Sequence, residues 1–212
     1  MKWVSLKSFT AILVFTFFPL FSVYGEHVDF DKEQPNMAPN EWRCGITGKG
    51  NPKWMVIPEN TAPSSPNVLR QSGRGTFPWC VIPGVSLSEG VVEVKFKTLS
   101  GNVDRAGGLV WRFKDGNQYY VARANALENN VSLYYVEKGI RKTITYVDAP
   151  VPQNEWNTLR VEFAADEITV SLNGKKYIDL KDANISGAGT VGVWTKADSE
   201  TVFDDFIYEG TR

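Results

Sequence analysis

The stretch GGLVWRFKDGNQYYVARANALENNVSLYYVEKGIRKTITYV, residues 107–147, decides the fold class. It contains apolar-rich runs of strand length that are separated by short turns. Asp115-Gly116 lies between the first two runs, and Lys138-Gly139 lies between the last two. An Asp-Gly pair between two such runs is a strong hairpin signal because both residues tolerate a positive φ. We therefore predict consecutive antiparallel hairpins in this part of the chain.

The same pattern continues on both sides of this stretch. Apolar and charged residues alternate over residues 92–96, as expected of a strand with one buried face. Further on, strand-like runs at 168–172 and 177–180 flank an Asn173-Gly174 turn. Roughly ten or more short strands follow one another, and no segment after the N-terminal region shows helical periodicity. We therefore predict an all-β fold, an antiparallel two-sheet β-sandwich or jelly roll.

The N-terminal segment has the organisation of a cleavable signal peptide. Basic residues precede an apolar run over residues 9–21, and small residues follow that run. We predict a signal peptide over residues 1–25, a single β-sandwich domain over residues 26–212, and a secreted or periplasmic location. An uncleaved membrane anchor is the alternative, although the run is shorter than the roughly 20 apolar residues that span a bilayer.

The charge balance excludes partners that are recognised by a strong overall field. The chain has 23 basic and 24 acidic residues, which give a formal net charge of −1. No overall field therefore attracts nucleic acid or an anionic membrane. No later apolar stretch is long enough to cross a bilayer, so we expect neither nucleic-acid binding nor stable membrane insertion.

Cys44 and Cys80 are the two cysteines of the chain. Export to an oxidising compartment would favour a disulfide between them. The alternative is a pair of buried thiols, and the choice depends on a Cα separation that the sequence does not give.

Four motifs in the second half of the chain carry a family resemblance. They are GGLVWRF (107–113), YYVARANALENN (119–130), GTVGVWTKADS (189–199) and FDDF (203–206). Together they resemble the concanavalin A-like, laminin-G-like sandwich domains of secreted bacterial proteins, which are related to the 3-keto-disaccharide hydrolase domain family. The resemblance extends over roughly residues 28–210 and implies a concanavalin A-like jelly roll. That superfamily contains hydrolases, lyases, lectins and adhesive modules, so the fold implies no single activity.

The residues offer few groups for catalysis. The single histidine, His27, stands next to the predicted cleavage site, where we expect a mobile side chain. A histidine-dependent triad or a zinc site is therefore disfavoured. The Glu-x-Asp-x-x-Glu pattern of laminarinase-type retaining glycosidases is absent. An enzyme would have to use another acid, for which Glu128 and Asp198 are the candidates.

A sugar site combines aromatic rings, which stack on the apolar faces of sugars, with planar donors and acceptors for the hydroxyl groups. Such residues concentrate in the central strands. The candidates are Trp111, Tyr120, Arg123, Asn125, Asn129, Trp194 and Lys196. The alternative is that the aromatic side chains pack in the core, which is their usual place in a sandwich. Strand alternation leaves open which of the two neighbouring tyrosines, Tyr119 or Tyr120, faces outward.

Arg123 lies in an otherwise apolar, tyrosine-rich strand. An arginine there must extend to solvent or pair with an acid, for which Glu128 and Asp198 are the candidate partners. A structural ion pair and a ligand clamp are both open interpretations.

Acidic residues near the two ends of the predicted domain suggest a structural calcium ion, the one cofactor that we consider. The first and last strands of such sandwiches commonly lie side by side, which would bring together Asp29, Asp31, Asp204 and Asp205. Carboxylate oxygens are the ligands that calcium prefers. The alternative is that these acids cap turns or bind backbone amides.

Three functions follow from these observations. The first is a lectin-like domain that recognises a glycan on an aromatic and polar sheet face. The second is a glycoside hydrolase related to the 3-keto-disaccharide hydrolases, and the third is an adhesive module of the laminin-G kind. We expect the first, with carbohydrate as the partner and no demonstrable catalysis.

Overall fold

The computed structural model describes residues 24–212, which form fifteen β-strands and no helix. The strands are β1 (Tyr24–Val28), β2 (Arg43–Asn51), β3 (Trp54–Pro58), β4 (Asn67–Gln71), β5 (Arg74–Val81), β6 (Glu89–Ser100), β7 (Ala106–Asp115), β8 (Gln118–Asn125), β9 (Asn130–Glu137), β10 (Ile140–Asp148), β11 (Asn157–Ala164), β12 (Glu167–Leu172), β13 (Lys175–Lys181), β14 (Thr190–Trp194) and β15 (Glu200–Thr211). No helix in this range is long and apolar enough to cross a membrane.

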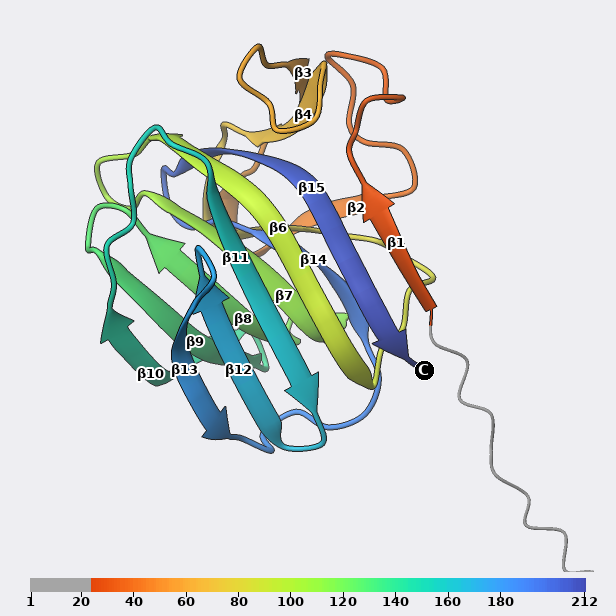
Figure 1. Cartoon of the computed structure of the whole chain (residues 1–212), viewed down its shortest axis with the longest axis vertical. Coiled ribbons are helices and arrows are strands. Elements are labelled where there is room, and N and C mark those ends of the chain that lie inside the picture. Colours follow the sequence, from red (N-terminus) through yellow and green to blue (C-terminus); the bar gives the residue numbers. More distant parts are fainter. Residues whose placement is uncertain (1–23) are drawn as a thin grey trace, which may run out of the picture.

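The strands form two antiparallel sheets that face each other (Figure 1). The eight-stranded sheet has the order β13-β12-β11-β6-β15-β4-β3, with β1 added beside β15. The seven-stranded sheet has the order β10-β9-β8-β7-β14-β5-β2. This arrangement confirms the predicted two-sheet sandwich, in which the hairpins β7-β8-β9-β10 stay within one sheet and the hairpins β11-β12-β13 stay within the other.

The three turns predicted from the sequence close hairpins in the structure. Asn173-Gly174 joins β12 to β13, and Lys138-Gly139 joins β9 to β10, each with a positive φ at both residues. The turn between β7 and β8 is displaced by one residue, because Asp115 pairs with Gln118 and leaves Gly116-Asn117 as the loop. Positive φ values are typical of the tight two-residue turns at 138–139 and 173–174, whereas neither Gly116 nor Asn117 has a positive φ.

The main core lies between the two sheets. It combines inward-facing residues of the eight-stranded sheet, such as Val94 and Phe203, with residues of the seven-stranded sheet such as Trp111. The Trp111 ring stacks on the Tyr120 ring at a centroid distance of 5.2 Å and an interplanar angle of 15°. Both side chains have no exposed surface. The core therefore accounts for the alternating apolar positions that the sequence shows.

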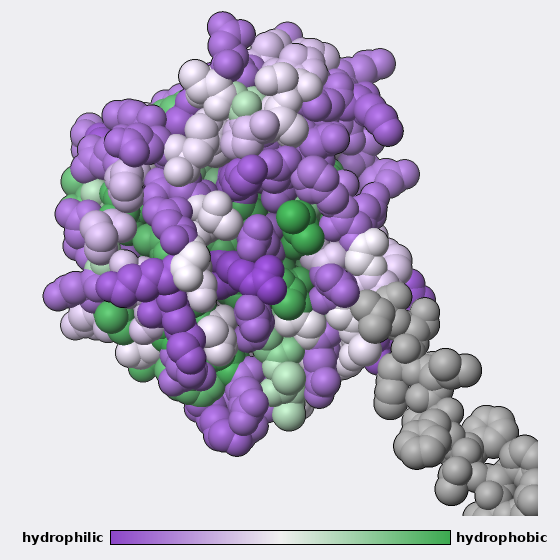
Figure 2. All heavy atoms as spheres, viewed as in Figure 1, coloured by the Kyte–Doolittle hydropathy of each residue, from purple (hydrophilic) through white to green (hydrophobic). Residues whose placement is uncertain are grey.

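A second apolar cluster covers the other face of the seven-stranded sheet. Its members all come from that sheet, so they lie on its outer surface; they include Trp79, Phe113, Tyr119, Tyr134 and Trp194, with Phe77 packed against them. We call these six aromatic residues the aromatic face. The outer surface of the eight-stranded sheet differs from it, since hydrophilic residues cover most of the view in Figure 2. The two outer surfaces are therefore chemically distinct.

The seven-stranded sheet curls around its outer surface. In the sheet order, β10 and β5 are separated by β9, β8, β7 and β14. Strands about 4.8 Å apart would place β10 and β5 about 24 Å from each other in a flat sheet. Nevertheless the guanidinium carbon of Arg141 on β10 lies 4.7 Å from the ring centroid of Phe77 on β5. The curl thus makes a hollow of the aromatic face and brings distant strands into contact across it.

The N-terminal strand changes one expectation. Most of the predicted signal peptide, residues 1–23, lies outside the described residues, but Tyr24 and Gly25 belong to β1 and pair with β15. His27 was expected to be mobile; instead its Nε2 atom lies 2.8 Å from Oδ1 of Asp205, which also accepts a hydrogen bond from Lys95. The pairing of β15 explains this, because β4 pairs with β15 only over residues 201–203 and leaves residues 206–210 available to β1.

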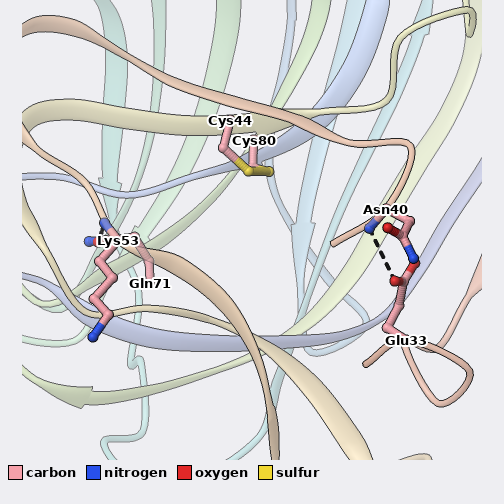
Figure 3. Close-up of a disulfide and its surroundings, with 6 residues drawn as sticks. All are labelled: Glu33, Asn40, Cys44, Lys53, Gln71 and Cys80. Atoms are coloured by element: carbon pink, nitrogen blue, oxygen red, sulfur yellow. Dashed lines mark hydrogen bonds between the residues drawn. A yellow bond between two sulfur atoms is a disulfide. The ribbon is translucent and has the colours of Figure 1, made fainter. Parts of the chain in front are cut away.

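Cys44 and Cys80 form the predicted disulfide bond (Figure 3). They are directly opposite each other in the register of β2 and β5. The bond therefore ties the edge strand β2 to its neighbour within the seven-stranded sheet.

Candidate functional site

The curled outer surface of the seven-stranded sheet contains a hollow that is lined by polar and charged side chains. It has a volume of about 240 Å³ and is lined by Arg123, Glu128, Asn130, Tyr134, Arg141, Thr143, Tyr146 and Lys196. We call it the Arg123 pocket. Strands β8, β9 and β10 supply most of its residues, and Lys196 comes from the turn after β14. Because β8, β9 and β10 are consecutive hairpin neighbours, residues close in sequence are also close in space here.

Arg123 organises this pocket, although only 3% of the residue is exposed. One Nη atom donates to Asp104, and the other donates to Glu128, Asn130 and Ser132 at 2.7, 3.0 and 3.2 Å. A buried guanidinium requires such partners, because an uncompensated charge in the protein interior is unfavourable by several kcal/mol. The sequence left two interpretations of Arg123 open, and these contacts establish the ion pair with Glu128.

Asp104 is the buried counter-ion beneath the pocket. It has no exposed surface and accepts hydrogen bonds from Arg123, Lys196 and Asn125. Burial raises the pKa of the Asp104 carboxyl, and the opposing effects of Lys196 and Arg123 do not cancel that rise. Asp104 therefore holds two of the cationic side chains in place and does not itself line the hollow.

Glu128 is the carboxylate that the pocket presents to solvent. Its side chain is 43% exposed, and its Oε2 atom accepts hydrogen bonds from Arg123 and Asn130 at 2.7 and 3.0 Å. Burial raises the pKa of this carboxyl, but the hydrogen bond from Asn130 and the charge of Arg123 hold the pKa below its usual value. Glu128 is therefore an ionised hydrogen-bond acceptor at neutral pH.

Arg141 covers the aromatic face at the rim of the pocket. Its guanidinium carbon lies 4.2 Å from the ring centroid of Tyr134, 4.7 Å from that of Phe77 and 6.0 Å from that of Trp194. Burial lowers the pKa of the Arg141 guanidinium, and the charge of Arg123 acts in the same direction. Arginine nevertheless stays cationic at neutral pH. The arginine thus closes one side of the pocket with a positive charge.

Two predicted ligand-binding rings, Trp111 and Tyr120, are not available to a ligand. Both are fully buried between the sheets, where Trp111 also packs against Phe163 of the opposite sheet. The Tyr120 hydroxyl is used internally, because it donates to Asp182 and accepts from the backbone amide of Ile185. The expectation that these rings form an open sugar-binding face is corrected here, because they belong to the inward-facing set of β7 and β8.

The other candidates have different positions. Trp194 does lie on the outer surface, but it is fully buried under Phe77, whose ring stacks on it at 5.6 Å, and under Arg141. Asn125 is also fully buried, and it binds Asp104 and the backbone amides that follow β8. Asn129 accepts a hydrogen bond from the backbone of Val151. Among the predicted ligand-binding residues, the structure gathers only Arg123 and Lys196 in the pocket lining.

The two catalytic candidates are separated. Glu128 lines the pocket, whereas Asp198 accepts hydrogen bonds from the backbone amides of Asn102, Val103 and Asp104, each at 3.0 Å. Burial raises the pKa of Asp198, and those three amides outweigh it and hold the pKa below its usual value. Asp198 therefore caps a loop and does not line the Arg123 pocket.

The four carboxylates considered for calcium have protein partners instead. Asp204 accepts from the backbone and side chain of Ser64, and Asp205 binds Lys95 and His27. Asp31 accepts from the backbone of Asn67, and Asp29 accepts from the backbone of Asp31. Across residues 24–212, no group of three or more acidic, histidine or cysteine side chains is placed to hold a metal ion. The structure thus does not assemble the expected calcium site.

Several pocket residues were missed by the sequence analysis. They are Tyr134, Arg141, Thr143 and Tyr146, and the buried Asp104 beneath the pocket was missed as well. The alternation of β10 could have indicated Arg141 and Thr143 as one face, but a bulge between Thr143 and Thr145 shifts the register before Tyr146. A bulge of this kind has no reliable sequence signal.

Larger hollows elsewhere offer poorer chemistry for a polar ligand. A hollow of about 270 Å³ contains Arg112, but the Nη atoms of Arg112 already donate to backbone carbonyls. One of about 390 Å³ beside β6 and β11 is lined by three carboxylates, Glu89, Glu162 and Glu167, without a cationic or amide side chain. Another of about 530 Å³ contains Tyr24 and Trp42, likewise without a cationic or amide side chain. Because specific binding of a polar molecule needs convergent donors and acceptors, the smaller Arg123 pocket is the better candidate.

Comparisons with solved structures place the fold in a group that includes carbohydrate-binding modules and glucanases. A carbohydrate binding module, CBM66 from Bacillus subtilis, has a TM-score of 0.63 and 22% identity, with 81% of this chain and 95% of that chain covered. The cellulose induced protein Cip1 has a TM-score of 0.63 and 13% identity, covering 88% and 97%. The β-glucanase of Bacillus licheniformis has a TM-score of 0.55 and 12% identity, covering 89% and 98%. At these identities the likeness shows the concanavalin A-like jelly-roll fold.

A search of curated proteins found no significant match. The model of one protein family, however, matches residues 86–206, which is more than half of the chain and contains every residue that lines the Arg123 pocket. This chain therefore belongs to the family of 3-keto-alpha-glucoside-1,2-lyase-like domains.

Proposed function

We propose that this protein is an exported carbohydrate-binding domain that takes a sugar residue in the Arg123 pocket. The observation that carries the proposal is the combination, in one hollow, of the 67% exposed ring of Tyr146 with the acceptor Glu128 and the amide of Asn130. A sugar has an apolar face that stacks on a ring and hydroxyl groups that need both donors and acceptors. The fold shared with a carbohydrate binding module supports this assignment.

The polar groups of the pocket are held in position before any ligand binds. Arg123 fixes Glu128, Asn130 and Ser132 through hydrogen bonds from one Nη atom. Asn130 in turn bonds both Glu128 and Ser132. Binding would therefore cost little side-chain entropy at these residues, which favours affinity for a small ligand. The ion pair of Arg123 thus serves the site even though the guanidinium itself is buried.

Replacing Tyr146 with alanine should weaken glycan binding by about three- to tenfold without altering the fold. An aromatic contact of this kind is worth about 0.5–1.5 kcal/mol beyond its buried area. Isothermal titration calorimetry against the glycan selected on an array would measure the change. Ile140→Ala is the matched control, because Ile140 is 64% exposed on the same strand and does not line the pocket. Equal affinities for both variants would exclude Tyr146 as the stacking platform.

A second function is favoured by family membership, namely cleavage of a 3-keto-glucoside in the same pocket. Within the described chain, Glu128 is the carboxylate among the residues that line the pocket, and its lowered pKa suits a base rather than an acid at neutral pH. On this alternative, wild-type protein would turn over a 3-keto-disaccharide and Glu128→Gln would lose about 100-fold or more of that rate. Absence of turnover by the wild type would leave glycan binding as the function.

A further inference from the structure

The charges of the Arg123 pocket do not balance. Three cationic side chains line it, namely Arg123, Arg141 and Lys196. Arg123 is neutralised by Asp104 and Glu128, and Lys196 is neutralised by the same Asp104. Arg141 has no ion pair with any carboxylate of the described residues. Three cations thus face two carboxylates, and the unmatched positive charge belongs to Arg141.

The surroundings of Arg141 leave its donors without acceptors. Aromatic rings of Tyr134, Phe77 and Trp194 lie against the guanidinium, and rings attract a cation through their faces without accepting its in-plane N–H groups. The Nη1 atom is buried and has no hydrogen-bond partner among residues 24–212. A buried donor that lacks a partner is unfavourable, so a group that accepts its hydrogen bond would bind with a clear gain.

We infer that the Arg123 pocket selects a glycan end that carries a carboxylate, a hexuronate residue, and that Arg141 binds this carboxylate. The inference rests on the glycan-binding function proposed above and names its ligand class. The planar fork of an arginine matches the two oxygens of a carboxylate, and Lys196, although paired with Asp104, contributes an ammonium donor to the same lining. Tyr146 would stack on the sugar ring. The volume of about 240 Å³ lies below the roughly 300–1,000 Å³ of sites for drug-sized ligands, which suits one terminal sugar ring.

Calorimetry with matched disaccharides tests this inference. Disaccharides that end in glucuronate or galacturonate are compared with those that end in glucose or galactose, which differ only at C6. The wild type should bind one uronate at least about tenfold more tightly than its neutral partner, because charge-assisted hydrogen bonds are roughly twice as strong as neutral ones. The preference should shrink as salt is added, since part of it is electrostatic. A third set with 6-O-sulfated hexoses identifies the anion.

Variants separate the role of Arg141 from a general effect of charge. Arg141→Gln should abolish the preference for the uronate, measured as the ratio of its affinities for the uronate and for the matched neutral sugar in the same variant. Arg141→Lys should restore part of the preference, because it keeps the charge without the planar fork. Lys142→Gln is the matched control on the same strand, since Lys142 is exposed and paired with Glu137. Thermal unfolding of each variant verifies that the fold is retained.

The outcomes distinguish the two proposals. Equal binding of uronate and neutral sugar by the wild type would overturn the carboxylate inference and leave glycan binding intact. A preference for the sulfated sugar over the uronate would overturn the choice of carboxylate. Binding of none of these sugars, and of none on a glycan array, would overturn both. An unchanged uronate preference in Arg141→Gln would remove the role of Arg141.

Discussion

Replacing Arg123 with methionine is expected to lower the free energy of unfolding by about 3–5 kcal/mol. Methionine fills a similar volume, so the loss is mainly electrostatic. Without the guanidinium, Asp104 keeps only Lys196 as a cationic partner while it remains fully buried. Removing one member of a buried ion pair leaves the other charge uncompensated, which is why the effect is large. Denaturant unfolding with an unchanged m-value would measure the difference.

Arg160→Met provides the matched control for this prediction. Arg160 also bridges two carboxylates, Glu93 and Glu162, but its side chain is 39% exposed on the eight-stranded sheet. Exposed ion pairs contribute only about 0–1 kcal/mol, because water and salt screen them. Similar losses for Arg123→Met and Arg160→Met would contradict the view that burial makes the Arg123 network essential.

The double substitution Cys44→Ala and Cys80→Ala is expected to lower the free energy of unfolding by about 2–5 kcal/mol. The two residues are 36 positions apart in the sequence, and closing a loop of that length in the unfolded chain corresponds to about 4 kcal/mol in the chain-entropy relation. The native pairing should survive, because backbone pairs on both sides of the bond, such as Gly45 with Trp79, remain. Oxidised and reduced wild type, unfolded in denaturant, provide an independent measurement.

Reduction supplies the control for the cysteine variant. Reduced wild type and the double alanine variant should have closely similar stabilities, since both lack the constraint on the unfolded chain. A reduced wild type as stable as the oxidised protein would show that the bond does not constrain the unfolded ensemble.

The hairpins were predictable because each depends on a few neighbouring residues. Lys138-Gly139 and Asn173-Gly174 adopt the positive φ values that their turns require, and turn geometry also fixes the local pairing. The cross-strand disulfide was more difficult, because β2 and β5 are not consecutive in the chain. Only their pairing in the sheet brings Cys44 opposite Cys80.

The side chains of β8 show why the site was only partly predictable. Alternation assigns residues to faces when one face of a strand is buried and the other is wet. In β8, however, Tyr119 and Tyr120 are both fully buried, one under the aromatic face and one in the core between the sheets. When both faces of a strand are apolar, the residue pattern does not distinguish the inward face from the outward face. The sequence therefore could not show that Tyr120 points inward.

The sequence by itself determined the fold class and the hairpins, because these depend on patterns of residues close along the chain, and it singled out Arg123 with Glu128 as one of two candidate partners. Only the tertiary structure decided that Asp104 is the buried counter-ion and that Arg141 lies against Phe77 and Trp194. Those contacts arise from the curl of a seven-stranded sheet, which joins strands far apart in sequence. Curvature is a collective property of twist, bulges and packing, and no local pattern of residues encodes it.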